Sequence, residues 1–318
     1  MGDKRILMGH TAFLFPGQGS QYAAMGKALA EQYEMARRVF DAADEALQFS
    51  LSKLCFEGPD EQLRKTENTQ PALLTVSIAA YRVLESLGYR PSLVAGHSLG
   101  EYSALVAAGS SDFHDAVRLV RNRGRYMQEA VPQGVGAMAA ILKLPLQRLD
   151  EILQQAAQGE IVTAANLNSP DQVVIAGHAS AVERAIQLAK SAGARRAVLL
   201  PVSAPFHCPL MRPAQERLRA DLDATNFRDL QFPLINNWQA REITTPAEAR
   251  EGLYQQVSNP VRWTDTVNQL SARGITKVVE VGAGSVLIGL CRSINPSLQT
   301  AKFGEPADLD TVTQLLAA

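Results

Sequence analysis

Apolar residues follow two spacings along this chain, and together they predict an α/β fold. Short continuous apolar runs at 11–15 and 93–95 are typical of strands that are buried on both faces. Stretches with the amphipathic spacing of helices lie around 25–30, 35–47 and 69–87. Strands that alternate with helices in this way indicate a largely parallel sheet with helices on both faces.

Residues 132–203 have a different pattern. Their predicted elements are, in order, a strand at 135–142, a helix at 145–157, strands at 161–165 and 173–176, a helix at 181–192 and a strand at 197–202. This βαββαβ order is the ferredoxin-like plan. We therefore expect a small subdomain inserted into a larger α/β-hydrolase-like domain that consists of residues 1–131 and 204–318.

A candidate nucleophile stands at the end of the second predicted strand. The sequence Gly96-His97-Ser98-Leu99-Gly100 follows that strand directly and precedes a helical stretch. Gly-x-Ser-x-Gly between a strand and a helix is typical of a nucleophile elbow, where a sharp turn exposes the serine hydroxyl and leaves no room for a Cβ on either side. The alternative is a serine in an ordinary turn.

A serine nucleophile needs a base, and His207 is the best placed of the five histidines. Pro205 and Pro209 bracket it and stiffen its loop, which lies at the expected domain junction. A histidine that only holds the junction by hydrogen bonds is the alternative. The neighbouring Cys208 suggests a Cys–His pair, but consecutive side chains in extended chain point apart.

The remaining parts of a Ser–His site are less sharply indicated. Asp265, Glu280 or a backbone carbonyl could orient the histidine. The backbone N–H of Leu99 directly follows the nucleophile, and the glycine-flanked turn at Gln18 could supply a second donor for an oxyanion.

Four arginines crowd the helix predicted after residue 112. At about 100° per residue, Arg123 lies closest to the apolar face, whereas Arg118, Arg121 and Arg125 turn toward solvent. A half-buried guanidinium suits capture of a substrate carboxylate. The alternative is an arginine whose stem merely covers apolar surface.

Composition narrows the function classes. The chain has 318 residues, 20% of them charged, and a net charge of −1, so nothing indicates binding to nucleic acid or to a membrane surface. Three widely spaced cysteines argue against a disulfide framework and favour a reducing cytoplasm. No Cys or His pair has metal-ligand spacing. Gly282-Ala283-Gly284 lacks the third glycine of a dinucleotide fingerprint, so we expect a structural turn there.

Taken together, these residues resemble the malonyl-CoA:acyl carrier protein transacylase family, the stand-alone acyltransferases of fatty acid synthesis. The resemblance covers nearly the whole chain. Its motifs are Phe15-Pro-Gly-Gln-Gly-Ser-Gln21, Gly96-His-Ser-Leu-Gly-Glu-Tyr-Ser103, Arg123-Gly124 with Met127-Gln128, Asn166-x-Asn-Ser-Pro170, Ser203-x-Pro-x-His-Cys208, Asn259-Pro-Val-x-Trp263 and Glu280-Val-Gly-x-Gly284. It implies an α/β-hydrolase-like core with a ferredoxin-like subdomain.

The resemblance also implies roles for individual residues. Ser98 would be the nucleophile, His207 the base and Arg123 the ligand of the free malonyl carboxylate. The N–H groups of Gln18 and Leu99 would form the oxyanion hole. The main-chain carbonyl of Gln256 would orient the histidine, which would explain why no acid stands out.

The implied activity is transfer of malonyl from malonyl-CoA to the phosphopantetheine thiol of holo acyl carrier protein, through a malonyl-serine, by a cytoplasmic monomer without a cofactor. Phe206 stands where many stand-alone members have a small residue, and its ring would favour malonyl over methylmalonyl. An acidic carrier protein should meet basic residues at the cleft mouth, for which Lys190, Arg195 and Arg196 are candidates. A serine hydrolase, an acyltransferase of a secondary pathway and a non-catalytic binding module are the alternatives.

Overall fold

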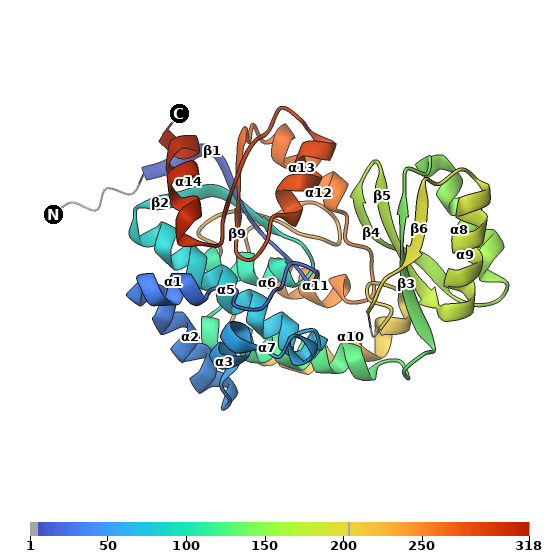
Figure 1. The fold of residues 1–318 in the computed structure, drawn as a ribbon, viewed down its shortest axis with the longest axis horizontal. Coiled ribbons are helices and arrows are strands. Elements are labelled where there is room, and N and C mark those ends of the chain that lie inside the picture. The colour runs from blue at the N-terminus through green and yellow to red at the C-terminus, as the bar shows by residue number, and fades with distance from the viewer. Residues whose placement is uncertain (1–5, 203, 318) are drawn as a thin grey trace.

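The computed structural model describes residues 6–202 and 204–317. Two separate sheets organise these residues, a large one and a small one that stand side by side (Figure 1). The expected boundary between the two domains at residue 203 falls on a position outside the described residues.

The large sheet has six strands, and five of them run parallel. In spatial order they are β10 (Gln299–Phe303), β9 (Lys277–Val281), β1 (Ile6–Phe15), β2 (Tyr89–Gly96), β7 (Leu234–Ile235) and the antiparallel edge strand β8 (Glu242–Ile243). The prediction of a mostly parallel sheet is therefore confirmed.

Helices cover both faces of the large sheet, as a parallel sheet requires. They are α1 (Lys27–Gln32), α2 (Glu34–Leu47), α3 (Leu51–Glu57), α4 (Asp60–Leu63), α5 (Thr66–Ser86), α6 (Leu99–Ala107), α7 (Phe113–Glu129), α10 (Arg212–Ala224), α11 (Pro246–Gln256), α12 (Trp263–Ala272), α13 (Val286–Ile294) and α14 (Leu309–Ala317). Short 3₁₀ turns occupy Leu146–Arg148, Pro209–Met211 and Pro306–Asp308.

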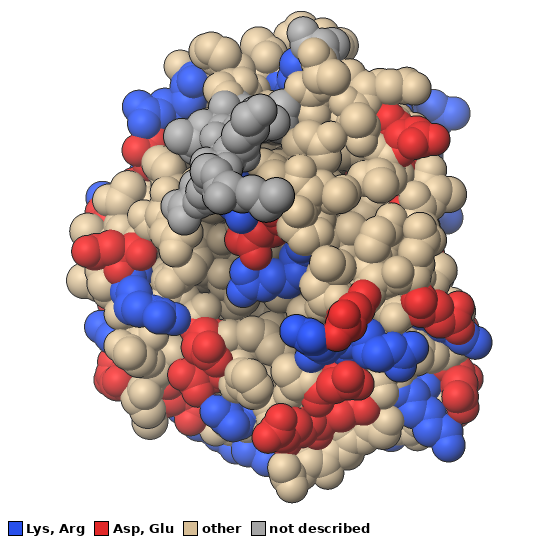
Figure 2. Space-filling view, turned by 90° about the vertical axis from the view of Figure 1, so that its left-hand side faces the viewer, with Lys and Arg blue, Asp and Glu red and all other residues tan. Residues whose placement is uncertain are grey.

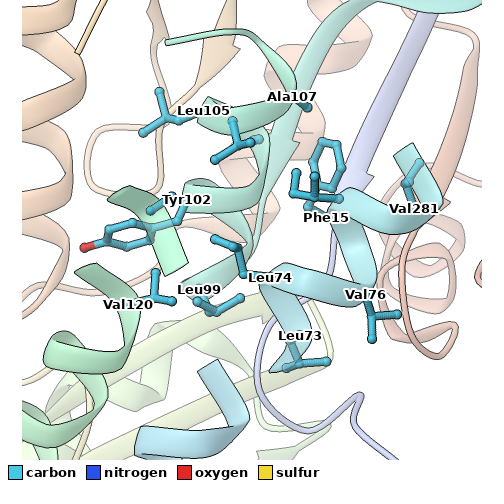
Figure 3. Close-up of a cluster of buried hydrophobic side chains, with 14 of the residues drawn as sticks. Phe15, Leu73, Leu74, Val76, Leu99, Tyr102, Leu105, Ala107, Val120 and Val281 are labelled. Atoms are coloured by element: carbon cyan, nitrogen blue, oxygen red, sulfur yellow. The ribbon is translucent and has the colours of Figure 1, made fainter. Parts of the chain in front are cut away.

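The alternation of side chains along β1 divides the large core in two. Phe13 and Phe15 belong to a cluster with residues of α5, α6 and α7, whereas Ala12 and Leu14 belong to one with residues of α12 and α13. Figure 3 shows part of the first cluster, in which Phe15 of β1 lies near side chains of α5 and α6. Burying one such large apolar side chain stabilises the folded state by about 1.5–3 kcal/mol relative to leaving it exposed.

The small sheet is antiparallel throughout, in the order β4 (Val162–Ser169), β5 (Gln172–His178), β3 (Gly136–Leu142) and β6 (Arg196–Leu199). Helices α8 (Leu149–Ala157) and α9 (Ala179–Ser191) cover the face of this sheet that points away from the large part (Figure 1). The predicted ferredoxin-like order is confirmed, because β3-α8-β4-β5-α9-β6 reads βαββαβ.

Charges of both signs are mixed over the face of the molecule shown in Figure 2, which lies opposite the small sheet. Lys and Arg side chains there stand beside Asp and Glu, in keeping with the net charge of −1. Among residues 6–202 and 204–317, no helix combines the length and the apolar character that crossing a bilayer needs.

Candidate active site

Ser98 stands in a strained turn between β2 and α6. Its φ of 52° and ψ of −108° lie in a region that residues with a Cβ rarely adopt. The flanking glycines make the turn possible, since a Cβ on Gly96 would lie 2.0 Å from the carbonyl of Gly100. Asn237 holds the turn from the side, because its Oδ1 accepts from the Ser98 N–H at 2.6 Å. The elbow expected from the sequence is present.

His207 lies against the nucleophile and is 3% exposed. Its Nε2 is 2.7 Å from the Ser98 Oγ, and its Nδ1 is 2.8 Å from the main-chain oxygen of Gln256. A carbonyl can only accept a hydrogen bond, so Nδ1 carries the proton and Nε2 is free to accept from the serine hydroxyl. Burial, and then the charge of Arg123, lowers the pKa of His207 to about 3. The imidazole is therefore neutral near pH 7.

The two acids that the sequence offered as partners of the histidine lie elsewhere. Asp265 pairs with Arg262 at 2.7 Å on the surface, and Glu280 accepts from the Ile288 N–H at the start of α13. Cys208 donates to the Pro205 carbonyl, and burial raises the pKa of its thiol to about 11. A backbone carbonyl, the third possibility, is what contacts His207.

Arg123 is buried on α7, whereas Arg118 and Arg125 on the same helix are exposed. Its Nη1 donates to Gln70 Oε1 at 2.7 Å, and its Nη2 donates to Gln256 Oε1 at 2.8 Å and to Ser98 Oγ at 3.2 Å. The Nε has no hydrogen-bond partner among the described residues. Burial lowers the pKa of Arg123, but a guanidinium stays charged in proteins. Among the described residues, the acceptors that bond to this cation are all neutral groups.

Gln18 and Leu99, the two residues expected to supply oxyanion donors, both lie beside the elbow. Leu99 is the first residue of α6, so its N–H has no partner within the helix and carries the positive end of the helix dipole. The turn that holds Gln18 lies against the elbow, since a Cβ on Gly17 would be 2.3 Å from the His97 carbonyl. The Gln18 side chain accepts from Thr66 Oγ1 at 2.9 Å. Gln18 and Leu99 both line the same cavity as Ser98.

A cavity of about 310 Å³ opens above Ser98 between the two sheets. The large part contributes its polar end, with Ser98, His207 and Arg123. The face of the small sheet opposite α8 and α9 contributes a wall, and Phe206, which lies outside that sheet, also lines the cavity with 8% of its surface exposed. The described lining residues that come from the small sheet and from the segment after β6 are Met138, Ala140, Asn166, Asn168, Gln172, Val174, Leu200 and Val202.

The three basic residues expected at the cleft mouth do not line this cavity. Lys190 lies on α9, on the opposite face of the small sheet, where it borders a separate hollow. Arg195 and Arg196 are exposed at the start of β6, at the end of the strand away from the site. None of the three therefore borders the cavity itself, and their contact with a carrier protein stays a prediction.

Residues that the sequence reading passed over complete the site. Asn237 holds the elbow, because it bonds to the Ser98 N–H. Gln70 accepts from Arg123, and Glu101 accepts from the Gln256 side chain. The signal for Glu101 in the sequence is an acid within an otherwise largely apolar helical stretch. Burial raises its pKa to about 7, opposed by hydrogen bonds from Asn237 and Gln256.

The turn at Gly282 and Gly284 is structural, as expected. Both residues have positive φ, at 129° and 83°. A Cβ on Gly282 would lie 2.4 Å from Ser77 Oγ, so the turn packs directly on α5.

Comparisons with known proteins agree with this geometry. The acyl transferase domain family matches residues 12–301. The malonyl CoA-acyl carrier protein transacylase of Bacillus subtilis is 49% identical, over 97% of this chain and 98% of that protein. A crystal structure of an acyl carrier protein S-malonyltransferase from Vibrio cholerae has a TM-score of 0.93 and 48% identity, over 95% of this chain and 99% of that one.

A second similar structure is that of a malonyl-transacylase in complex with its type II PKS acyl-carrier protein. It has a TM-score of 0.94 and 45% identity, and the match covers 97% of this chain and 100% of that one. These matches cover at least 95% of this chain, so they include both the large and the small part of the fold. The chain belongs to the acyl transferase domain family, and within it to the malonyl CoA-acyl carrier protein transacylases.

Proposed function

We propose that this protein is an acyltransferase that moves the malonyl group from malonyl-CoA to the phosphopantetheine thiol of holo acyl carrier protein, and so supplies fatty acid synthesis. The observation that carries this proposal is a buried cation 3.2 Å from an activated serine. A malonyl thioester has a carboxylate one methylene away from the carbonyl that Ser98 would attack. Arg123, beside Ser98, would pair with that carboxylate.

The first half-reaction begins at the Ser98–His207 pair. His207 Nε2 takes the hydroxyl proton as Ser98 Oγ attacks the thioester carbonyl. The N–H groups of Gln18 and Leu99 stabilise the oxyanion, and the Gln256 carbonyl stabilises the imidazolium. The C–S bond then breaks, and the thiolate of coenzyme A receives the proton from His207. Malonyl-Ser98 remains.

The second half-reaction repeats these steps with a new nucleophile. His207 takes the proton of the phosphopantetheine thiol, whose sulfur attacks the malonyl-Ser98 ester. The C–O bond breaks, and Ser98 recovers its proton from His207. The chemistry is ping-pong and uses no cofactor. The apolar side chains of the cavity wall, Met138, Val174 and Leu200 among them, support transfer over hydrolysis, because they limit water beside the ester.

Intact mass spectrometry tests the proposal. Brief incubation with malonyl-CoA should add one malonyl group to the wild-type protein and none to Ser98→Ala, and holo acyl carrier protein should remove it. Release of free malonate without carrier protein would instead show a hydrolase. Absence of both adduct and turnover would refute the proposal.

A carrier protein of a polyketide pathway is the second candidate acceptor, and the similar malonyl-transacylase solved with a type II PKS carrier protein favours keeping it. Chasing malonyl-Ser98 with carrier proteins of both kinds distinguishes the two by rate. We also propose that the protein acts in the cytoplasm as a monomer. Its three cysteines are buried free thiols, which supports a reducing compartment.

Phe206 is proposed to select malonyl over methylmalonyl. Its ring lies in the cavity wall directly before His207, where it would meet a substituent on the α-carbon. Phe206→Ser should raise the ratio of methylmalonyl to malonyl loading about tenfold, the usual scale for one methyl group in a pocket. Equal loading of both thioesters by the wild-type protein would rule out this role.

A further inference from the structure

Glu101 is a fully buried acid directly behind the nucleophile. It lies on the first turn of α6, and its side chain is 0% exposed. Burying a carboxylate costs free energy unless hydrogen bonds compensate. Here a single oxygen, Oε2, accepts from the Asn237 N–H at 3.0 Å and from the Gln256 Nε2 at 2.8 Å. The other oxygen has no hydrogen-bond partner among the described residues and faces Gly252.

Gln256 is one of the two groups that Glu101 holds, and it touches the site at three places. Its main-chain oxygen contacts His207, its Oε1 accepts from Arg123, and its Nε2 also donates to the Ser98 carbonyl at 3.1 Å. An amide presents an acceptor on one side and donors on the other. If it turned over, its NH₂ would face the Arg123 guanidinium, which can only donate. Glu101 Oε2, which already accepts from the Asn237 N–H, favours the same orientation because it accepts from the Gln256 NH₂.

Asn237 is the second group. Its main-chain N–H binds Glu101, while its side chain accepts from the Ser98 N–H and donates to the Gly96 carbonyl at 2.6 Å. One carboxylate oxygen therefore ties together the loop that shapes the elbow and the helix end that orients the base.

We propose that Glu101 is a positioning residue of this transferase, which fixes the Gln256 amide that holds Arg123 and the Asn237 loop that presents Ser98. This inference rests on the proposed function. Glu101 acts through its oxygen as a hydrogen-bond acceptor and does not touch the substrate. Its loss should therefore affect malonyl, which needs Arg123 in place, more than acetyl, which needs only the elbow and the base.

Rates of malonyl and acetyl loading, followed by rapid quenching and intact mass, provide the test. Glu101→Met keeps the length of the side chain and removes the acceptor. It should slow malonyl loading about 30-fold, the scale of a hydrogen bond to a charged group, and acetyl loading several-fold less. Glu101→Gln retains an acceptor oxygen and should recover most of the loss. Ser103→Ala, a buried position on the same helix, is the control for disturbance of α6.

A double-mutant cycle separates positioning from a general structural role. Gln256→Ala retains the main-chain carbonyl. On that background, Glu101→Met should lower the ratio of the malonyl loading rate to the acetyl loading rate by less than about threefold. Should Glu101→Met not fold, Glu101→Asp, which withdraws the carboxylate by one methylene, replaces it with the same expected direction. Equal losses for both acyl groups, no recovery in Glu101→Gln, or additive losses in the cycle would overturn the inference. Failure of the wild-type protein to load malonyl would instead refute the proposed function.

Discussion

Arg123 is a buried cation whose hydrogen-bond partners, among the residues that the structure describes, are all uncharged. Gln70, Gln256 and Ser98 supply the acceptors, and the Tyr102 ring lies 5.3 Å from the guanidinium carbon. Such a group keeps a large part of its charge available for an anion that enters the cavity. The arrangement suits a ligand that brings its own carboxylate.

Replacing Arg123 should therefore separate two substrates. Arg123→Ala should slow malonyl loading at least about 100-fold, because the substrate carboxylate would then be buried without a partner. Acetyl loading should be unchanged or faster. Stopped reactions with malonyl-CoA and acetyl-CoA, analysed by intact mass, measure both. Arg118→Ala, on the exposed face of the same helix, is the matched control. Equal losses for the two thioesters would exclude the carboxylate-binding role.

The pH dependence of loading should report the environment of His207. Only the neutral imidazole can accept the serine proton, so a lower pKa extends activity to lower pH. A histidine with the ordinary pKa of 6.5 would lose about 30-fold in rate at pH 5. With the pKa of His207 near 3, acetyl loading should change less than about threefold between pH 8 and pH 5. A fall centred near pH 6.5 that persists in Glu101→Gln, which removes the other group with a pKa near neutrality, would show that the histidine is less shielded than its burial indicates.

The sequence indicates single residues unevenly, for physical reasons. Ser98, His207 and Arg123 could be found because a local pattern surrounds each one: a glycine turn, paired prolines, a helical face. The Gln256 contribution is a main-chain oxygen, which no side-chain pattern reveals, and only the resemblance pointed to it. Glu101 and Asn237 are 136 positions apart, so their contact depends on how α6 packs against the loop after β7.

At the scale of elements, the elbow depends on how closely α6 approaches β1. A Cβ on Gly100 would lie 1.9 Å from the Phe15 carbonyl oxygen, a backbone atom that cannot move aside alone. Gly100→Ala should therefore lower the free energy of unfolding by about 2–3 kcal/mol and disturb Ser98. Urea unfolding, followed by circular dichroism, measures this.

Gly289 offers the control for that substitution. It is exposed in the middle of α13, and no atom lies within 4 Å of a Cβ built there. Gly289→Ala should leave stability unchanged or raise it by up to about 1 kcal/mol through helix propensity. Equal stabilities of the two alanine variants would mean that α6 does not press on β1 in this way.

Helices and strands could be predicted from the sequence where burial alone determines the spacing of apolar residues. The apolar runs of β1 and β2 are buried on both faces, and the βαββαβ order of the small part follows from well-spaced apolar segments. The two-residue strands β7 and β8 were not predicted. A strand that short has no periodicity, and β7 exists because its backbone pairs with β2, a contact distant in sequence.

The whole molecule depends on how the two sheets are joined. We propose that residues 132–203 form the inserted subdomain and that residues 1–131 and 204–318 form the large domain. Strand β4 makes the connection, because the backbones of Leu167 and Ala165 both bond to Val261, and Thr264 Oγ1 donates to the Leu167 carbonyl. The cavity wall is thereby fixed relative to the nucleophile.

Asn168 on β4 extends this connection to the elbow itself, since its Oδ1 lies 2.8 Å from Nε2 of His97, the residue before the nucleophile. Asn168→Ala would remove the partner of that part-buried ring nitrogen, at a cost of about 1 kcal/mol, the usual net contribution of one hydrogen bond. The lost hydrogen bond lies at the junction of the two sheets, so amide hydrogens of β4 should exchange faster and malonyl loading should slow about tenfold. Amide hydrogens in the core of the large sheet should keep their protection from exchange. Asn295→Ala, which removes a hydrogen bond to Ser271 far from the junction, should change neither. Hydrogen exchange measured by mass spectrometry decides the matter: uniform loss of protection across both sheets would show that the contact stabilises the fold as a whole, without coupling the wall to the nucleophile.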